Sequence, residues 1–222
     1  MINVEIWSDV VCPFCYIGKR KFEQALSEFP LRDQVNVVWR SFELDPGARP
    51  KPGQTLTQTL AHKYGQSEAW AEQMQQGVAA SAAQVGLNFQ LHKALPVNTF
   101  DAHRLIHLAT QHGLQDVAEE RLFKAYFEEG ADIGNREILV KLGSEIGLHE
   151  DEISRVLDSE QFSEAVRRDE SEAQTLGIRG VPFFVLNNKY GISGAQPKEV
   201  FLEALQQVWN ESKPLEMDGT RI

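Results

Sequence analysis

The stretch that decides the fold is Ser8–Lys19, with the sequence SDVVCPFCYIGK. It contains Cys12 and Cys15, the only two cysteines among 222 residues. Before it, Ile2–Trp7 alternates apolar and polar residues, which predicts a half-buried strand. After it, Lys19–Phe29 has helical periodicity. The two cysteines therefore lie where a strand gives way to a helix.

The spacing of these cysteines favours chemistry over a structural role. Residues three apart on a helix share a face, so Cys12 and Cys15 can come close enough to form a disulfide. That bond closes a very short loop, so it contributes little to stability through loop closure. Pro13 suits the first helical position and places Cys12 at the positive end of the helix dipole. We expect a Cys12 thiolate that is open to solvent, with Cys15 as a buried resolving thiol.

Other interpretations of the motif have less support. A structural zinc site needs about four ligands, and no second cysteine pair exists. Two ordinary core cysteines remain an alternative, although a strand–CxxC–helix context is typical of a redox motif. His103 and His107, near Asp101, have metal-ligand spacing but lack further clear ligands. We therefore predict no metal site and interpret the two histidines as part of a partly exposed polar face.

The overall charge narrows the classes of partner. A formal net charge of −10 argues against nucleic acid and anionic membranes. No apolar run approaches the roughly 20 residues of a membrane span. The first residues lack the basic region of a signal peptide, and the cysteines occur only as CxxC. These features predict a cytoplasmic protein, in which such a pair is kept largely reduced.

Strands are expected near both ends of the chain. Val35–Phe42 reads as a second strand, parallel to the first and joined to it by a right-handed crossover. The proline- and glycine-rich residues 44–53 predict a loop. Strand character returns at Val181–Leu186 and Lys189–Ser193, with Asn187-Asn188 as a two-residue hairpin loop, and a last helix begins at Pro197.

The middle of the chain shows helical patterns and no convincing strand. These patterns predict a block of helices inserted between the second and third strands. Within this block, Arg167–Glu170 is interpreted as a solvated helix face. Glu43 and Asp45 lie before the block, after the second strand, and are interpreted as solvated loop carboxylates. One of these two carboxylates could relay protons to Cys15. The expected helices are Thr55–Tyr64, Ser67–Val85, Thr99–His112, Gln115–Glu128, Arg136–Ile146, Glu150–Leu157 and Glu160–Leu176.

Three segments in this order resemble a known family. They are residues 8–18 (SDVVCPFCYIG), 177–184 (GIRGVPFF) and 192–196 (ISGAQ). Together they resemble the DsbA-like thiol oxidoreductases. More specifically, they are similar to the FrnE-like branch, which is related to the 2-hydroxychromene-2-carboxylate isomerases and the kappa-class glutathione transferases. The resemblance extends to about residue 211.

The resemblance implies an α/β, thioredoxin-like fold with a large all-helical insertion. Residues 1–53 and 177–212 would form a discontinuous thioredoxin-like domain, and residues 54–176 an inserted helical domain. Neither end portion is large enough to bury a good core alone, so the two must combine. Residues 213–222 carry little pattern and are expected to form a tail.

The resemblance also assigns roles around the dithiol. It implies a cis peptide bond between Val181 and Pro182, with Pro182 shaping a groove in which Val181 pairs with the substrate main chain. Pro13 and Phe14 would contact the substrate. Phe14 stands where the DsbA type has histidine, so we expect a less oxidising couple than that of DsbA.

Glutathione enters through the same relatives. By analogy, Val181 and the segment 96–100, including Asn98, are candidate contacts for it. Asn98 or Thr99 is read more readily as the N-cap of the next helix, because both residue types are frequent at that position. We expect no bound cofactor, with glutathione as a candidate co-substrate.

The function predicted by the residues and the resemblance is thiol–disulfide exchange, as an oxidoreductase or disulfide isomerase. Cys12 attacks a disulfide in a protein or in a small molecule, and Cys15 resolves the mixed disulfide. Two alternatives stay open. One is glutathione-dependent isomerase or transferase chemistry on a small hydrophobic molecule, and the other is a non-catalytic binding module using Phe14, Phe183 and Phe184. A homodimer is also considered.

Overall fold

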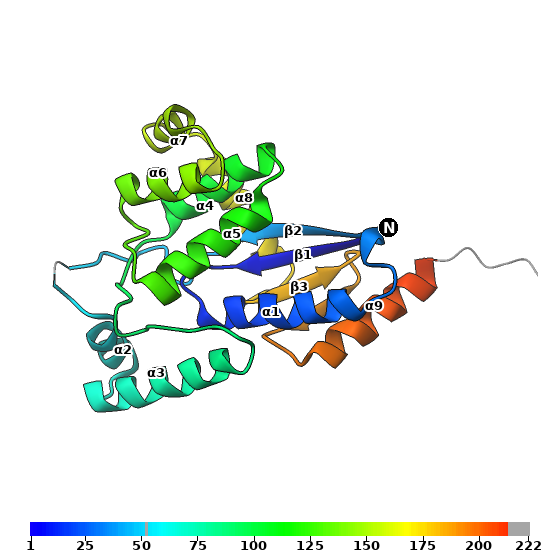
Figure 1. The fold of residues 1–222 in the computed structure, drawn as a ribbon, viewed down its shortest axis with the longest axis horizontal. Helices are drawn as coiled ribbons and strands as arrows, with labels where there is room; N and C mark the ends of the chain where they lie inside the picture. Colours follow the sequence, from blue (N-terminus) through cyan, green and yellow to red (C-terminus); the bar gives the residue numbers. More distant parts are fainter. Residues whose placement is uncertain (52, 213–222) are drawn as a thin grey trace, which may run out of the picture.

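The computed structural model describes residues 1–51 and 53–212 of the chain, so the expected tail at 213–222 lies outside the described residues. Its centre is a four-stranded mixed sheet with the strand order β2-β1-β3-β4 (Figure 1). β1 (Ile2–Ser8) pairs in parallel with β2 (Val35–Ser41). β3 (Phe183–Leu186) lies antiparallel to β1, and β4 (Tyr190–Ser193) lies antiparallel to β3. The predicted β-α-β and β-β-α ends therefore meet in one sheet.

One face of the sheet is covered by α1 (Pro13–Glu28) and α9 (Lys198–Ser212), which lie side by side (Figure 1). Alternation in β1 places Ile2, Val4 and Ile6 in this core, where they are fully buried. Three phenylalanine rings, one each from α1, β3 and α9, pack with centroids 4.7 to 5.5 Å apart. The sheet and its two end helices thus share one apolar core.

The insertion between β2 and β3 is helical, as expected. Each of the seven expected helices is present in the described residues, with small shifts at its ends. The fourth element of the insertion, α5, continues into a wider π-helical segment, η2, which ends at Gly130. The elements are α2 (Leu56–Tyr64), α3 (Glu68–Ala83), α4 (Phe100–Gln111), α5 (Gln115–Lys124), η2 (Ala125–Glu129), α6 (Arg136–Glu145), α7 (Glu150–Leu157) and α8 (Ser163–Thr175).

Local side-chain chemistry explains where several helices begin. The Thr55 hydroxyl accepts a hydrogen bond from the Gln58 N–H, and the Gln58 side chain accepts one from the Thr55 N–H. This reciprocal pair satisfies backbone donors that the helix itself leaves free. Ser67 caps α3 in the simpler way, by accepting from the Trp70 N–H. A short 3₁₀ turn, η1 (Arg32–Gln34), precedes β2 and was not expected.

The hairpin between β3 and β4 is present, but the predicted loop length is wrong. Leu186 pairs with Tyr190, so the loop has three residues, 187–189, instead of two. Asn187 and Asn188 both have positive φ, 48° and 54°, which asparagine tolerates well. The turn closes when the Lys189 N–H donates to the Leu186 carbonyl.

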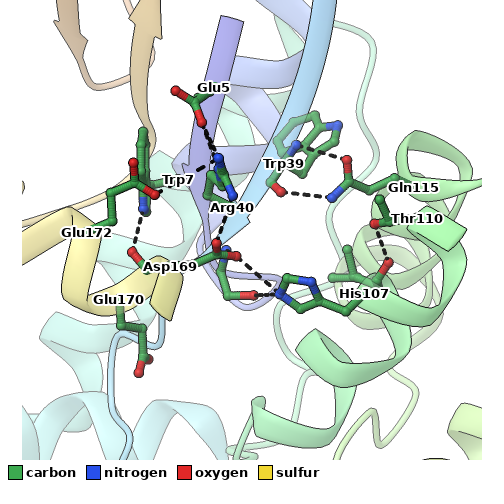
Figure 2. Close-up of polar contacts among 12 residues, drawn as sticks. Glu5, Trp7, Trp39, Arg40, His107, Thr110, Gln115, Asp169, Glu170 and Glu172 are labelled. Atoms are coloured by element: carbon green, nitrogen blue, oxygen red, sulfur yellow. Dashed lines mark hydrogen bonds and ion pairs between the residues drawn. The ribbon is translucent and has the colours of Figure 1, made fainter. Parts of the chain in front are cut away.

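A polar network joins the insertion to the edge of the sheet at β2 (Figure 2). Asp169 of α8 accepts hydrogen bonds from the Ser41 N–H at 2.9 Å and the Arg40 guanidinium at 3.1 Å, and lies 3.1 Å from His107 Nε2. Burial alone would raise the pKa of Asp169, but His107, Ser41 and Arg40 together hold it below its usual range. The expectation of a solvated face is therefore wrong for Asp169, which is 3% exposed because α8 turns it toward β2.

The free edge of β2 is also covered by a side chain. The Gln115 amide accepts from the Trp39 N–H at 3.1 Å and donates to the Trp39 carbonyl at 2.8 Å (Figure 2). It therefore takes the place of a neighbouring strand at this position. Within the described part of the chain, no helix is long and apolar enough to cross a bilayer.

We predict that Asp169→Asn lowers the free energy of unfolding by about 2 to 3 kcal/mol, because a buried charge-assisted hydrogen-bond network is broken. Urea unfolding near neutral pH measures this change. Glu164→Gln on the same helix is the control, since its side chain is 95% exposed, and its effect should stay below about 0.5 kcal/mol. Equal stability of the two variants would show that the network does not dock α8.

Candidate active site

The dithiol lies at the junction of β1 and α1. Cys12 is the N-cap residue of α1 and Pro13 is the first helical residue, as predicted. The Cys12 N–H donates to the Asp9 carbonyl at 2.9 Å, and the Cys15 N–H donates to the Cys12 carbonyl at 3.0 Å. Both thiols are free, and the Cys15 thiol is within hydrogen-bonding reach of Cys12. The motif thus places the two free thiols next to each other at the start of α1.

The predicted burial is right for Cys15 and wrong for Cys12. Cys15 is 1% exposed and Cys12 only 4% exposed, because the insertion packs over both. Cys12 nevertheless borders a groove of about 640 Å³, together with Pro13, Phe14 and Val181. Its Sγ lies 3.5 Å from the Val181 carbonyl, to which it donates. A reagent therefore reaches Cys12 along this groove and not from open solvent.

The surroundings of Cys15 keep it protonated. Burial is the main cause that raises the pKa of the Cys15 thiol, and the hydrogen bond and charge of Cys12 raise it further. The Asp9 backbone N–H and the Ser8 hydroxyl oppose this shift only partly. Cys15 therefore needs to lose a proton before it can act as a nucleophile.

The loop before β3 completes the wall beside Cys12. The peptide bond between Val181 and Pro182 is cis, as the family resemblance implied. A Cβ on Gly18 would lie 3.0 Å from Pro182 Cγ and 3.5 Å from Ala195 Cβ, so the glycine allows α1 to approach this loop closely. The sequence contains a signal for this contact, because Gly18 lies inside a predicted helix, but the close approach to the Pro182 loop was not predicted from it.

The groove runs between the two groups of insertion helices. In Figure 1, α2 and α3 lie on one side of the beginning of α1, and α5 with η2 lies on the other. Met74 and Val78 of α3 and Tyr126 and Phe127 of η2 line its apolar part. Its exposed rim carries Arg49, Lys51, His62 and Lys63, and among the described residues that line the groove Asp45 is the one exposed carboxylate.

Asn98 occupies a different position from the one the glutathione analogy suggested. Its Oδ1 accepts from the Phe100 N–H at 3.0 Å, and its Nδ2 donates to the Pro46 carbonyl at 3.3 Å. Its neighbours Val97 and Thr99 line the groove beside Cys12, whereas Asn98 borders a separate cavity. The N-cap residue of α4 is Thr99, whose side chain makes no capping hydrogen bond, and the Asn98 side chain instead holds the N–H of the first helical residue, Phe100.

The two histidines of α4 belong to separate networks. His103 is 1% exposed, so the expectation of a partly exposed polar face is wrong for it. Its Nε2 lies 3.5 Å from Asp9 Oδ1, whereas His107, one turn further along the helix, contacts Asp169 of α8. Residues 1–51 and 53–212 contain no group of three histidines, cysteines or carboxylates arranged to hold a metal ion.

Burial by itself would lower the pKa of His103, but several carboxylates outweigh it. The close contact with the Asp9 carboxylate comes first, followed by the charges of Glu119 and Glu43, so the net shift is upward. The Asp9 carboxylate is also fixed by the Leu44 N–H, which donates to its Oδ2 at 2.7 Å. Asp9 is 1% exposed and lines the groove next to Cys12.

Glu119 of α5 is a buried carboxyl group that the sequence interpretation missed. It is 1% exposed, and burial raises its pKa to about 8, with further increases from Asp116 and Asp9. His103 and Lys19 lower that pKa in part. A signal was present in the sequence, because Glu119 continues the apolar stripe of α5 and η2 at helical spacing. That stripe contains Leu122, Phe123 and Tyr126.

Glu43 also departs from expectation, since it is 5% exposed and not a solvated loop carboxylate. Its carboxylate is 2.5 Å from Arg167 of α8. The two residues are far apart in the chain, so the sequence pattern did not predict this contact. Burial raises the pKa of Glu43, and Arg167 opposes that increase. Asp45 is exposed, as predicted. Neither carboxylate is in contact with Cys15 among the hydrogen bonds described.

A mixed four-stranded sheet with a CxxC pair opening its first helix, and a helical insertion between its strands, defines a thioredoxin-like oxidoreductase fold. Residues 3–206 match the model of the DSBA-like thioredoxin domain, and the chain belongs to that family.

Individual relatives agree with the family. The chain is 29% identical over 206 residues, 92% of its length and 96% of the relative's, to the uncharacterized protein YwbO of Bacillus subtilis. It is similar to the crystal structure of the probable DsbA oxidoreductase SCO1869 from Streptomyces coelicolor, with a TM-score of 0.91, 43% identity and coverage of 98% and 94%. A 2-hydroxychromene-2-carboxylate isomerase shares the fold, with a TM-score of 0.71, 12% identity and coverage of 94% and 97%.

We predict that Glu119→Gln stabilises the protein in a pH-dependent manner. The folded-state pKa of about 8 lies above the ordinary value of 4.5, so the wild type loses stability as pH rises between these values. The variant lacks this loss and should gain a few kcal/mol near pH 8 but little near pH 4. Thermal unfolding at several pH values measures the difference. A gain of the same size at all pH values would contradict the assignment.

Proposed function

We propose that this protein is a thiol–disulfide oxidoreductase that works through Cys12 and Cys15. The observation that carries the proposal is a free dithiol at the start of a helix, with Cys12 on the wall of a groove and Cys15 buried behind it. The positive end of a helix dipole favours negative charge, as an attacking sulfur at this position requires. The assignment to the FrnE-like branch, which rests on residues 8–18, 177–184 and 192–196, is part of this proposal.

The exchange has two steps. The Cys12 thiolate attacks one sulfur of the substrate disulfide, a Cys12–substrate disulfide forms, and the second substrate sulfur leaves with the electron pair and takes up a proton. Cys15, once deprotonated, attacks Cys12 Sγ, which forms the Cys12–Cys15 disulfide and releases the first substrate sulfur. The substrate is reduced by two electrons and the dithiol is oxidised. The reverse sequence oxidises a dithiol substrate or, with partial reversal, isomerises disulfides.

The residues around Cys12 suit an extended or flexible disulfide substrate. Phe14 is 46% exposed at the groove and offers an apolar contact. Val181 presents main-chain groups next to Cys12 Sγ, and Pro182 with Pro13 shapes the wall. We propose a disulfide-containing protein or a small disulfide as substrate, in the cytoplasm, with no cofactor needed for the exchange itself.

We predict that Cys12→Ser abolishes reduction of insulin and of glutathione disulfide in a coupled assay. Cys15→Ser should instead accumulate a mixed disulfide at Cys12, visible as an added mass under non-reducing conditions, because the resolving thiol is gone. Both substitutions replace one atom and keep the size of the side chain nearly constant. Turnover that survives Cys12→Ser would exclude this mechanism.

The same variants separate the alternatives. Glutathione-dependent isomerase or transferase chemistry predicts activity that persists in Cys15→Ser, since only one sulfur is used. A non-catalytic binding module predicts that binding of unfolded polypeptide is unchanged when both cysteines are replaced.

The cationic rim of the groove favours anionic small disulfides such as glutathione disulfide. In a chain of net charge −10, the exposed groups that border the groove in residues 1–51 and 53–212 include Arg49, Lys51 and Lys63 but only one carboxylate, Asp45. Positive groups around a cleft raise the local concentration of negatively charged ligands and their association rates. We therefore propose glutathione as a co-substrate that approaches between this rim and Cys12.

We predict that the double variant Lys51→Glu/Lys63→Glu reacts about tenfold more slowly with glutathione disulfide at low ionic strength. Its rate with an uncharged hydroxyethyl disulfide should change less than about twofold, and the effect should shrink in high salt. Lys141→Glu is the matched control, because Lys141 is exposed on α6 and does not line the groove. Equal slowing with both disulfides would show that the rim does not select charge.

A further inference from the structure

The hydroxyl of Ser8 is a buried group to which the exchange mechanism above gives no part. Ser8 is the last residue of β1 and is fully buried. Its carbonyl accepts from the Phe42 N–H at 3.1 Å, but its Oγ has no well-formed hydrogen bond among the residues that the structure describes. A buried polar atom without a partner destabilises the folded state, so this hydroxyl calls for an explanation.

Strand geometry sets the direction of the Ser8 side chain, because side chains alternate between the two faces of a strand. Ile6 packs in the core between the sheet and α1. The Trp7 indole lies on the other face, where its Nε1 donates to the Asp169 carbonyl of α8 at 2.9 Å. Ser8 therefore shares the face that α1 covers. Since α1 begins at Pro13 and runs back along β1, its first turn lies over this end of the strand (Figure 1).

That first turn carries Cys15, which is 1% exposed. Burial is the main cause that raises the pKa of the Cys15 thiol, and the Ser8 hydroxyl, which is within hydrogen-bonding reach of that thiol, lowers it. The other groups that act on the thiol are Cys12, which is titratable and raises the pKa, and the Asp9 backbone N–H, which lowers it. Ser8 is therefore a side-chain donor beside the resolving sulfur.

We propose that the Ser8 hydroxyl donates a hydrogen bond to the Cys15 sulfur when that sulfur becomes a thiolate in the second step of the exchange. This inference rests on the proposed function and adds a residue to its resolving step. The bond is not made to the protonated thiol, which is a weak acceptor, and it forms as negative charge develops on the sulfur. Interactions made only on the way to the transition state lower the barrier.

The step balances without an added reagent. In the mixed disulfide, the Cys15 thiol loses its proton to solvent, and the Ser8 O–H turns toward the resulting thiolate. The thiolate attacks Cys12 Sγ, the Cys12–Cys15 bond forms, and the bond from Cys12 to the substrate sulfur breaks. That sulfur leaves with the electron pair and takes up a proton from solvent. The dithiol is oxidised, the substrate sulfur is reduced, and Ser8 keeps its proton throughout.

Burial gives this hydrogen bond its weight. Cys15 is closed off from bulk water, so a donor from the protein replaces part of the hydration that a thiolate would have in solution. Hydrogen bonds to charged groups are about twice as strong as neutral ones, and a low local dielectric strengthens them further. Removal of the hydroxyl should therefore have opposite effects: it relieves the resting dithiol of an unpartnered buried atom and slows the resolving step.

The test follows the reduced full-length protein as it reacts with an aromatic disulfide that releases coloured thionitrobenzoate. The first release reports attack by Cys12, and the second reports resolution by Cys15. Ser8→Ala should leave the first release within about twofold and slow the second about tenfold at neutral pH, as expected for loss of a hydrogen bond to a charged group. In a Cys12→Ser background, where Cys15 is the only thiol, thiolate absorbance should show its pKa raised by about one unit in Ser8→Ala.

Ser8→Thr and Ser41→Ala are the matched controls. Ser8→Thr keeps the hydroxyl, and threonine suits a strand, so the second release should return to within about threefold of the wild-type rate. Ser41 is the partner of Ser8 on β2 and is also buried, but its hydroxyl contacts His107 Nε2 at 3.2 Å. Ser41→Ala should therefore lower the urea midpoint and leave the second release unchanged, whereas Ser8→Ala should be at least as stable as the wild type.

A second release at the wild-type rate in Ser8→Ala overturns the role of this hydroxyl, while the exchange mechanism stands. Failure of Ser8→Ala to fold, or equal slowing of both releases with a lower urea midpoint, also overturns it, because Ser8 would then be a structural residue. A wild-type protein that shows no first release overturns the exchange mechanism itself.

Discussion

The structure depends on the packing of the first turns of α1 against the helical insertion. The Tyr16 ring, one residue after Cys15, stacks on Phe123 with centroids 4.8 Å apart and contacts Phe89 and Phe127. Its hydroxyl donates to Glu120 at 2.7 Å. Cys12 and Cys15 belong to this same apolar core. The insertion is therefore part of the environment of the dithiol, because the core that stabilises it also buries the sulfurs.

This packing explains why the site is a groove with buried acid–base groups. Covering the dithiol removes water, which raises the cost of ionising Cys15 and Glu119 and strengthens each remaining charge interaction. The α2–α3 pair stays apart from the other insertion helices (Figure 1) and leaves a channel to Cys12. The same insertion helices, one group on each side of α1, therefore bury the dithiol and leave the route by which a substrate reaches Cys12.

Much of the fold could be predicted from local sequence patterns. Alternation in β1 and the helical periods predicted the elements to within a few residues. The predicted hairpin loop was one residue too short, because two asparagines with positive φ fit a loop of two or of three residues. The candidate site was predicted less completely. His103, Glu119 and Asp169 are polar residues whose burial depends on which neighbours face them, and helical spacing alone does not reveal those neighbours.

The sequence by itself determined the chemistry of the motif and the order of the elements. Two cysteines one helical turn apart, a proline at the first helical position and a strand before them are local features, and local geometry places them. Only the tertiary structure decided that Cys12 is buried beside a groove and that Asp9 meets His103 and Glu119 behind it. Those contacts join residues far apart in the chain, and their energies come from packing and loss of solvent, which no short stretch of sequence contains.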